Sequence, residues 1–405
     1  MAIQPMVAQR SLLPKPALRP ISNGSAAGMK VAGLFAGIGG IELGLHRAGH
    51  STALLCEIEP GAQEVLRARF DGIQLEPDVT TIASLPRSVD LLTAGFPCQD
   101  LSQAGRTLGI EGERSGLVGE VFRLLRKRRT PWVLLENVSF MLQLQRGRAL
   151  EKIVASLEEL GYSWAYRVVD SRFTGIPQRR ERVYILASLE GDPRSVLLSE
   201  DAGPPVDLER TDWWAAPCGF YWTEGLRGLG WAFNSVPTLK GGSSVGIPSP
   251  PAIIFPNGSL AKPDIRDLER LQGFEPGWTS PAERVARPGH RWKLVGNAVT
   301  VDVANWIGRR LKAPFPYDDS VDQELTPGAP WPKSAWGIGG ERFRSGASAW
   351  PEPSTSPDLS RFLQFPTSPL SVRAASGFME RAGRSSLRFP PRFLDAVRDH
   401  IRALA

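Results

Sequence analysis

A cysteine stands where a buried strand is expected to end. Cys98 lies in the run Gly-Phe-Pro-Cys-Gln at 95–99, directly after the apolar segment 89–94. A thiol at the exit of a parallel strand, next to a proline that stiffens the backbone, is positioned to act as a nucleophile. The alternative is an inert thiol, because free cysteine is among the most buried residue types. The nucleophile hypothesis therefore requires a cofactor site, an acid and a substrate clamp in the same domain.

The first segment with strand character ends in a glycine-rich turn. Residues 29–36 are mainly apolar and lead into Gly-Ile-Gly-Gly at 37–40. Glycines in a strand-to-helix turn let the backbone approach a ligand. A second expected strand, 52–56, ends at Glu57, whose carboxylate could accept hydrogen bonds from ribose hydroxyls. The sixth position of a dinucleotide-binding pattern is occupied by Glu42, so the sequence predicts a nucleoside site without a pyrophosphate cradle; a plain tight turn is the alternative.

Two further strands bring charged side chains toward the same region. The apolar run 132–135 ends at Glu136, at the sheet edge expected for the thiol. A buried carboxylate is unfavourable unless it is solvated or functional, although such a residue is more often a helix cap. A strand at 183–187 is preceded by Arg180 and Arg182, which alternation would point the same way. These cations could form a clamp, or a solvated basic strand edge.

The order of these motifs resembles that of the cytosine-5 DNA methyltransferases. The resemblance covers residues 29–310, about two thirds of the chain. Six segments carry it: Phe35-Ala36-Gly37-Ile38-Gly39-Gly40, Gly95-Phe96-Pro97-Cys98-Gln99, Glu136-Asn137-Val138, Gln178-Arg179-Arg180-Glu181-Arg182, Leu271-Gln272-Gly273-Phe274 and Gly296-Asn297-Ala298-Val299. It implies an α/β fold with the Rossmann-like, doubly wound sheet of S-adenosylmethionine-dependent methyltransferases. A smaller target-recognition domain would be inserted into that fold, and a C-terminal extension would follow it.

The resemblance assigns four catalytic residues. Cys98 would add to ring carbon six of cytosine, which makes carbon five nucleophilic toward a methyl sulfonium. Glu136, protonated in a closed site, would donate to ring N3 and recognise the exocyclic amine. Arg182 would bind the ring carbonyl oxygen, with Arg180 supporting the site. Because the ring is inaccessible inside a duplex, the base would have to be flipped out.

The resemblance also implies the cofactor S-adenosylmethionine and a set of binding residues. Cofactor contacts would come from Phe35, Gly37, Gly39, Gly40, Glu57, Ile58, Asp78, Val79, Pro97, Asn297 and Ala298. DNA contacts would come from Gln99, Ser102 and Arg114 in a loop that closes over the flipped base, and from Arg227, Asn234, Thr238, Lys240 and Ser243 in the recognition region. No metal site is expected.

Changes in composition suggest a division of the chain. The expected parts are a disordered basic tail at 1–28, a catalytic and cofactor-binding domain at 29–187 completed by 290–310, a target-recognition domain at 188–289, and an extension at 311–405. Met29 directly precedes the first strand, so translation could also start there. The patterned aromatic residues of the extension indicate that it is folded. Bracing of the catalytic domain is favoured slightly over contacts with flanking DNA.

Composition limits the class of protein. The 405 residues, of which 42% are hydrophobic, can bury a substantial core, and the length suggests two or three domains. A net charge of +6 favours a polyanionic partner, here double-stranded DNA. Three widely spaced cysteines form neither a disulfide framework nor a zinc pattern, which fits a reducing compartment. No apolar run approaches membrane-spanning length. We expect a monomer in the bacterial cytoplasm, associated with the nucleoid.

Two other functions compete with this prediction. A transfer-RNA cytosine methyltransferase would share the catalytic motifs but carries a Cys-Phe-Thr element, whereas Cys218 is followed here by Gly219 and Phe220. A non-catalytic DNA-binding relative would have lost Cys98 or Glu136, and both are present. The sequence therefore predicts a DNA cytosine-5 methyltransferase and favours the modification enzyme of a restriction system. The cognate endonuclease would be a functional rather than a physical partner.

Overall fold

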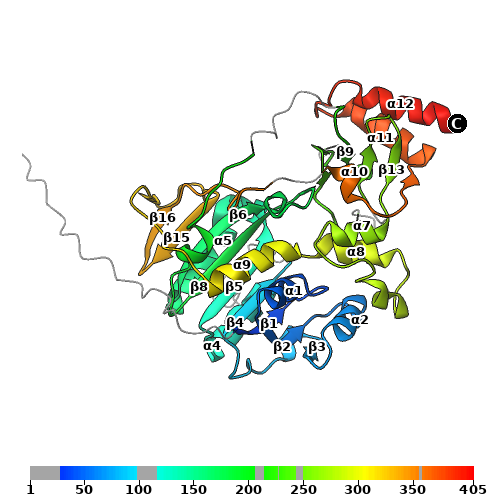
Figure 1. Cartoon of the computed structure of the whole chain (residues 1–405). Helices are drawn as coiled ribbons and strands as arrows, with labels where there is room; N and C mark the ends of the chain where they lie inside the picture. The colour runs from blue at the N-terminus through cyan, green and yellow to red at the C-terminus, as the bar shows by residue number, and fades with distance from the viewer. Residues whose placement is uncertain (1–27, 98–115, 206–213, 227, 243–249, 355–357) are drawn as a thin grey trace, which may run out of the picture.

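Two sheets of unequal size organise the molecule. The computed structural model describes residues 28–97, 116–205, 214–226, 228–242, 250–354 and 358–405. These residues form a ten-stranded sheet with helices on both faces and a five-stranded sheet that carries the last two helices. In Figure 1 the large sheet lies at the lower left and the small one at the upper right, with α7 and α8 between them. No helix in the described ranges is long and apolar enough to cross a membrane. Apart from Gly28, the predicted tail lies outside them.

The large sheet has a parallel core that antiparallel strands extend. Five strands pair in parallel in the order β3-β2-β1-β4-β5, the arrangement of doubly wound nucleotide-binding folds. On the far side of β5 come β8, β6, β15, β16 and β14, each antiparallel to its neighbour. The bounds are β1 Lys30–Leu34, β2 Ser51–Cys56, β3 Gln74–Glu76, β4 Leu91–Gly95, β5 Trp132–Val138, β6 Ser163–Asp170, β8 Glu181–Ser188, β14 Gln323–Glu324, β15 Ser334–Ile338 and β16 Glu341–Arg344. This topology agrees with the predicted α/β, Rossmann-like fold class.

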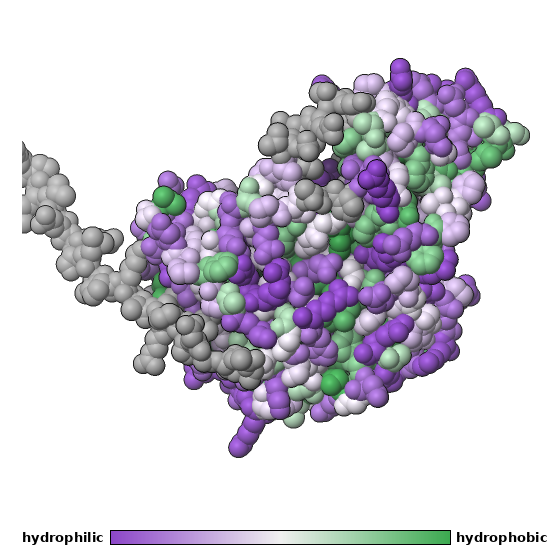
Figure 2. Space-filling model, viewed as in Figure 1, coloured by the Kyte–Doolittle hydropathy of each residue, from purple (hydrophilic) through white to green (hydrophobic). Residues whose placement is uncertain are grey.

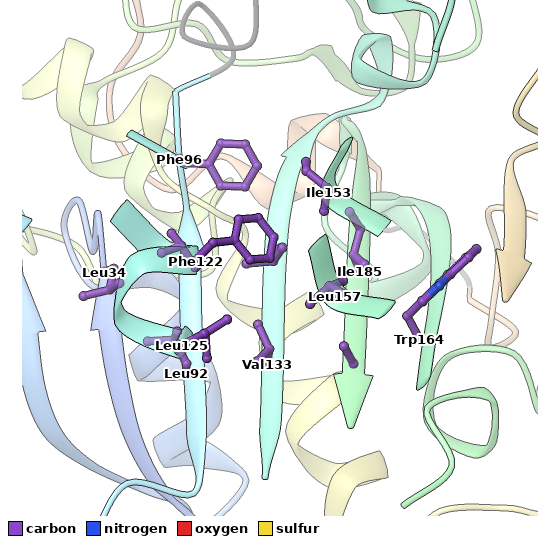
Figure 3. Close-up of a cluster of buried hydrophobic side chains, with 14 of the residues drawn as sticks. Leu34, Leu92, Phe96, Phe122, Leu125, Val133, Ile153, Leu157, Trp164 and Ile185 are labelled. Atoms are coloured by element: carbon purple, nitrogen blue, oxygen red, sulfur yellow. The ribbon is translucent and has the colours of Figure 1, made fainter. Parts of the chain in front are cut away.

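Burial on both faces explains why the central strands are continuous apolar runs rather than alternating ones. Helices α4 (Leu117–Lys127) and α5 (Arg148–Glu159) cover one face. Figure 3 shows this layer, in which helix side chains meet strand side chains: Phe122, Leu125, Ile153 and Leu157 against Leu92, Val133 and Ile185. Phe96 closes the upper end of the layer, just before the Cys98 segment begins.

The opposite face is covered by segments far apart in the sequence. Helix α1 (Gly40–Arg47) packs beside α9 (Val301–Lys312), with α6 (Arg194–Leu197) next to them. Close packing requires a glycine at position 44, because a Cβ atom there would stand 2.3 Å from the Val301 carbonyl oxygen. The chain therefore returns after residue 300 to complete the first domain. Helix α2 (Pro60–Arg69) packs against α8 (His290–Asn297) at one end of the sheet.

The small sheet has the strand order β10-β9-β12-β13-β17. Its strands are β9 Cys218–Phe220, β10 Trp231–Phe233, β12 Ala252–Ile254, β13 Leu260–Lys262 and β17 Ser368–Pro369, and a separate parallel pair joins β7 Gln178–Arg179 to β11 Val236–Pro237. Helices α11 (Val372–Arg384) and α12 (Phe393–Leu404) pack on this sheet, where Phe378 and Phe393 enclose Phe220. Two short helices, α7 (Ile265–Arg270) and α10 (Leu359–Phe362), lie below it.

The C-terminal extension is divided between the two sheets. Residues 323–350 add three strands to the large sheet and bury Trp336 and Trp350 in its core. Residues 358–405 instead pack with the small sheet. The structure also places 188–205 with the large sheet, because α6 packs in that core and Arg167 donates to the carbonyls of Leu197 and Glu200. These boundaries differ from those expected from composition.

Candidate active site

A cavity of about 890 Å³ opens where the parallel strands end and the small sheet meets the large one. Most of its lining comes from three groups of elements. The carboxyl ends of the parallel strands contribute Phe35, Gly37, Ile38, Cys56, Glu57, Ile58, Asp78, Val79, Gly95, Phe96, Pro97, Glu136, Asn137 and Val138. The segment before β8 and the small-sheet side contribute Arg180, Arg182, Tyr221, Thr238, Leu239, Lys240 and Gly241, and the region of α8 contributes Lys293, Leu294, Gly296 and Asn297. In doubly wound folds, ligands bind in this crevice.

The glycine-rich turn presents one glycine to the cavity and packs two behind it. Gly37 has a positive φ of 55°, and a Cβ atom there would meet nothing within 4 Å, so its backbone faces open space. Gly39 (φ 84°) lies against the ring of Phe70, and Gly40 lies against the Val299 carbonyl. Neither of these two lines the cavity. The turn therefore offers a ligand the backbone at Gly37, while the other glycines permit close packing.

The Glu57 carboxylate is fixed by the turn that it faces. Its Oε2 accepts from the Gly37 N–H at 2.8 Å and its Oε1 from the Glu59 N–H at 2.8 Å. Each carboxylate oxygen can accept a second hydrogen bond, so capacity remains for ligand hydroxyls. Burial raises the pKa of Glu57 despite these two bonds. Beside it, Ile58 is 71% exposed, which is unusual for a large apolar side chain and suits a stacking contact at the cavity mouth.

The other predicted cofactor residues lie in the cavity lining or directly behind it. Val79 is buried, and Asp78 accepts the Thr80 N–H with Oδ1, which lowers the pKa of its carboxyl. Pro97 and Asn297 also line the cavity, whereas Ala298 lies behind it.

The Glu136 carboxyl is buried at the other end of the cavity. Parallel pairing places it opposite Gly95, two residues before Pro97. Its Oε1 lies 3.3 Å from Nε of Arg182, and only 8% of the residue is exposed. Burial raises the pKa of Glu136, although Arg182 and Arg180 act in the opposite direction. A carboxyl in this position can remain protonated closer to neutral pH than a solvated one, as a hydrogen-bond donor to a ring nitrogen requires.

Arg180, which lines the cavity, connects three segments of the chain by hydrogen bonds. Its Nη1 donates to the Leu239 carbonyl at 3.0 Å and its Nη2 to the Ala298 carbonyl at 2.6 Å. Burial lowers the pKa of this guanidinium to about 9. Its Nε has no hydrogen-bond partner among the described residues. Arg180 therefore positions the backbone of two cavity walls. A supporting role of this kind is what the sequence predicts for it.

Two buried side-chain amides add hydrogen bonds to the walls of the cavity. Neither belongs to the predicted set of site residues. Asn137 donates from Nδ2 to the Phe96 carbonyl at 3.0 Å and so fixes the strand end that leads to Cys98. Gln178 donates to the Leu271 carbonyl and accepts the Leu239 N–H. Both amides belong to the quoted motifs, and a buried amide next to a carboxylate or arginine is the signal that could have identified them.

The small-sheet side of the cavity carries Thr238, Lys240 and Tyr221. Thr238 donates to the Arg179 carbonyl at 2.8 Å, and Lys240 lies 3.2 Å from Glu224 and 4.0 Å from the ring centre of Tyr221. Tyr221, absent from the predicted set, donates to the Thr238 carbonyl. The small-sheet side therefore presents polar and aromatic side chains to the cavity.

One predicted DNA contact has a different position. Asn234 does not line the cavity; its Oδ1 accepts the Leu359 N–H at 2.9 Å and so joins the small sheet to α10. Six other predicted residues lie outside the described ranges: Cys98, Gln99, Ser102, Arg114, Arg227 and Ser243.

Comparison with known proteins identifies the family of this chain. A model of the C-5 cytosine-specific DNA methylases matches residues 29–209. Over 384 residues the chain is 47% identical to the type II methyltransferase M2.BsuMI of Bacillus subtilis (strain 168), a match that covers 91% of this chain and 97% of that protein. The chain belongs to the C-5 cytosine-specific DNA methylase family. It is a DNA cytosine-5 methyltransferase that uses S-adenosylmethionine, which confirms the predicted activity and cofactor.

Other members resemble part of this methyltransferase. The type II methyltransferase M.BanI of Aneurinibacillus aneurinilyticus is 40% identical over 177 residues, which cover 42% of this chain and 41% of that protein. The crystal structure of S. pombe Dnmt2 methyltransferase aligns with a TM-score of 0.50 and 19% identity, covering 70% of this chain and 98% of that chain. This structural likeness concerns the fold alone.

Proposed function

We propose that Cys98, Glu136, Arg180 and Arg182 carry out methyl transfer to a flipped-out cytosine. The observation that carries the proposal is the buried Glu136 carboxyl, 3.3 Å from Arg182, in the cavity that Pro97 of the Cys98 motif also lines. Ring N3 and the carbonyl oxygen of cytosine accept hydrogen bonds, whereas its exocyclic amine donates. A protonated carboxyl beside a guanidinium matches that edge.

In this mechanism the Cys98 thiolate forms a bond to ring carbon six. Electron density then moves through the ring toward N3, and Glu136 donates its proton there. Carbon five gains enamine character and can attack the methyl group of the sulfonium, whose carbon–sulfur bond would break to leave a neutral thioether. Loss of the carbon-five proton to a base and departure of the thiolate restore the aromatic ring, while the N3 proton returns to Glu136. Arg182 binds the carbonyl oxygen throughout.

The other end of the cavity is where we place the cofactor. S-adenosylmethionine supplies a methyl group on a sulfonium. The open space beside Gly37 and the remaining acceptor capacity of Glu57 fit a nucleoside with free ribose hydroxyls. Ile58 and Val79 would contact the adenine, and Asp78 would accept from its amine.

We further propose that the small sheet reads the DNA sequence and that the enzyme acts as a monomer in the bacterial cytoplasm, near the nucleoid. Thr238 and Lys240 face the cavity from that side, which supports a role beside the target base. The type II names of M2.BsuMI and M.BanI favour a modification enzyme that protects DNA from a cognate restriction endonuclease.

Trapping with 5-fluorocytosine tests the catalytic assignment. Fluorine cannot leave as a cation, so a duplex that contains this base at the target should stall as a covalent adduct after methyl transfer. We expect an adduct on Cys98 that requires S-adenosylmethionine and is absent in Cys98→Ser, since a hydroxyl is far less ionised than a thiol. Cys218→Ser is the matched control, because burial raises the pKa of Cys218 to about 12.

Two outcomes would contradict the mechanism. The first is an adduct on Cys56, which lines the cofactor end of the cavity but whose thiol pKa burial raises to about 12. The second is full methylation by Cys98→Ser. Glu136→Gln should slow adduct formation strongly while cofactor binding persists, because it removes the proton donor and leaves the Glu57 end unchanged.

A further inference from the structure

The positive charge of this methyltransferase is concentrated near its C-terminus. Residues 359–405 contain eight arginines and three acidic residues, against a net charge of +6 for the whole chain. This segment lies outside the family motifs and forms no part of the cavity lining. Such an excess far from the reacting groups needs a separate explanation, because neither the cofactor nor the flipped base reaches it.

The end of α11 and the loop after it run along the hairpin that joins β9 to β10. Trp231 donates from its indole to the Arg388 carbonyl, Trp214 to the Pro391 carbonyl, and Arg381 to the Trp222 carbonyl. The hairpin begins at Tyr221, which lines the cavity. Residues 381–391 therefore pack beside the hairpin whose first residue lines the cavity that the target base would enter.

Two arginines of this stretch, Arg384 and Arg388, are exposed and weakly partnered, whereas Arg381 is half-buried and donates to the Trp222 carbonyl. Arg388 makes no ion pair among the described residues, and Arg384 lies 3.7 Å from Glu380, with both side chains more than two thirds exposed. Exposed pairs of this kind contribute little and leave the cation available. Arg398 and Arg402 on α12 also form exposed pairs, each with an aspartate one turn away, but they lie outside the stretch of residues 381–391 that contacts the hairpin.

We propose that Arg384 and Arg388 bind backbone phosphates of the duplex that flanks the target site. The inference rests on the proposed reading of DNA by the small sheet. A surface of exposed cations gains affinity for DNA by displacing counterions, and phosphate contacts set the register of a protein on the duplex. Figure 2 shows hydrophilic residues along the top of the upper lobe that holds α11 and α12, next to apolar patches. The extension thus braces the small sheet and lengthens its DNA contact.

Two double variants with equal loss of charge test this. Arg384→Gln/Arg388→Gln removes the proposed contacts, and Arg398→Gln/Arg402→Gln removes two arginines of α12 that lie outside residues 381–391. Binding is measured with a short duplex limited to the target region and with one extended by ten base pairs on each side, over a range of salt. We expect the first variant to lose the added affinity of the long duplex and to reduce the salt slope by about 1.8, at roughly 0.9 per phosphate contact. The second should behave like the wild type.

Equal losses in both variants would show a diffuse charge effect and overturn the assignment. An unchanged affinity of the first variant for the long duplex would also overturn it, and the extension would then only stabilise the small sheet. Methylation at saturating DNA and the melting temperature should be unaffected, because neither arginine touches the cavity or a core. Absence of methylation by the wild type would instead refute the proposed function, and the binding experiment would still report on the flank contact.

Discussion

Glu42 carries a buried carboxyl that the reaction does not use, and its protonation at neutral pH can be tested by experiment. It lies in the first turn of α1 and is 1% exposed. Its Oε1 accepts from the Thr93 hydroxyl at 3.0 Å, and its Oε2 has no hydrogen-bond partner among the described residues. Desolvation raises the pKa of Glu42 from 4.5 to about 7. At neutral pH the fold therefore holds this carboxyl partly protonated.

The raised pKa makes stability depend on pH with a definite sign. The folded state binds the proton more tightly than the unfolded state, so the contribution is complete below about pH 4.5 and is lost as the pH rises through about 7. At about 1.4 kcal/mol per pH unit, the wild type should lose about 2.5 kcal/mol between pH 5 and pH 8 through Glu42 alone. Glu42→Gln removes this loss, since an amide does not titrate.

Urea unfolding at pH 5 and pH 8 measures the effect as a double difference. The change in unfolding free energy between the two pH values is compared in the wild type and in Glu42→Gln, with Glu159→Gln as a control on the exposed end of α5. The control should follow the wild type. A wild type and a Glu42→Gln variant with parallel pH dependence would refute the assignment of a proton to this buried site.

Three further outcomes are expected. Arg180→Lys should lower the methylation rate about tenfold or more without weakening S-adenosylmethionine binding. The reason is that an ammonium cannot bridge the two backbone carbonyls that the guanidinium joins. Transfer kinetics at saturating DNA measure the effect. Burial lowers the pKa of His50, whose ring meets the Met29 N–H and the Gly308 carbonyl, so stability should fall as the pH drops below 6.5, and His50→Gln should flatten this step in unfolding curves. Grafting 214–262 from a relative of other specificity should change the methylated sequence only when 358–405 is grafted too, because the two segments share one core; bisulfite sequencing reports the result.

The parallel half of the fold could be predicted because its signals are local. Strands buried on both faces appear as continuous apolar runs, and glycine, proline or acidic residues mark their ends. This rule predicts strands at 29–36, 52–56 and 132–135, and β1, β2 and β5 lie there. The motif residues then meet at one sheet edge because parallel strands share their direction.

The division of the extension could not be predicted in the same way. Strands β14 and β17 contain two residues each; β14 pairs with β16, about twenty residues later in the extension, and β17 pairs with β13, more than 100 residues earlier in the chain. A two-residue strand has no periodicity to detect, and its position depends on tertiary pairing. The position of Asn234 illustrates the same limit, since its partner Leu359 lies 125 residues away. The assignments of the catalytic and binding residues stay predictions.

The pairing of β15 with β6 has a consequence for synthesis of the chain. About 160 residues separate the end of β6 from the start of β15, so at 5–20 residues per second a ribosome needs roughly 10 to 30 s to supply the neighbour strand. Throughout that interval the growing polypeptide displays one unpaired edge of β6, including Trp164 and Tyr166, a template for association with other chains. Newly made enzyme therefore depends most on chaperones while residues 171–334 are being translated, and slow codons there should lower its yield.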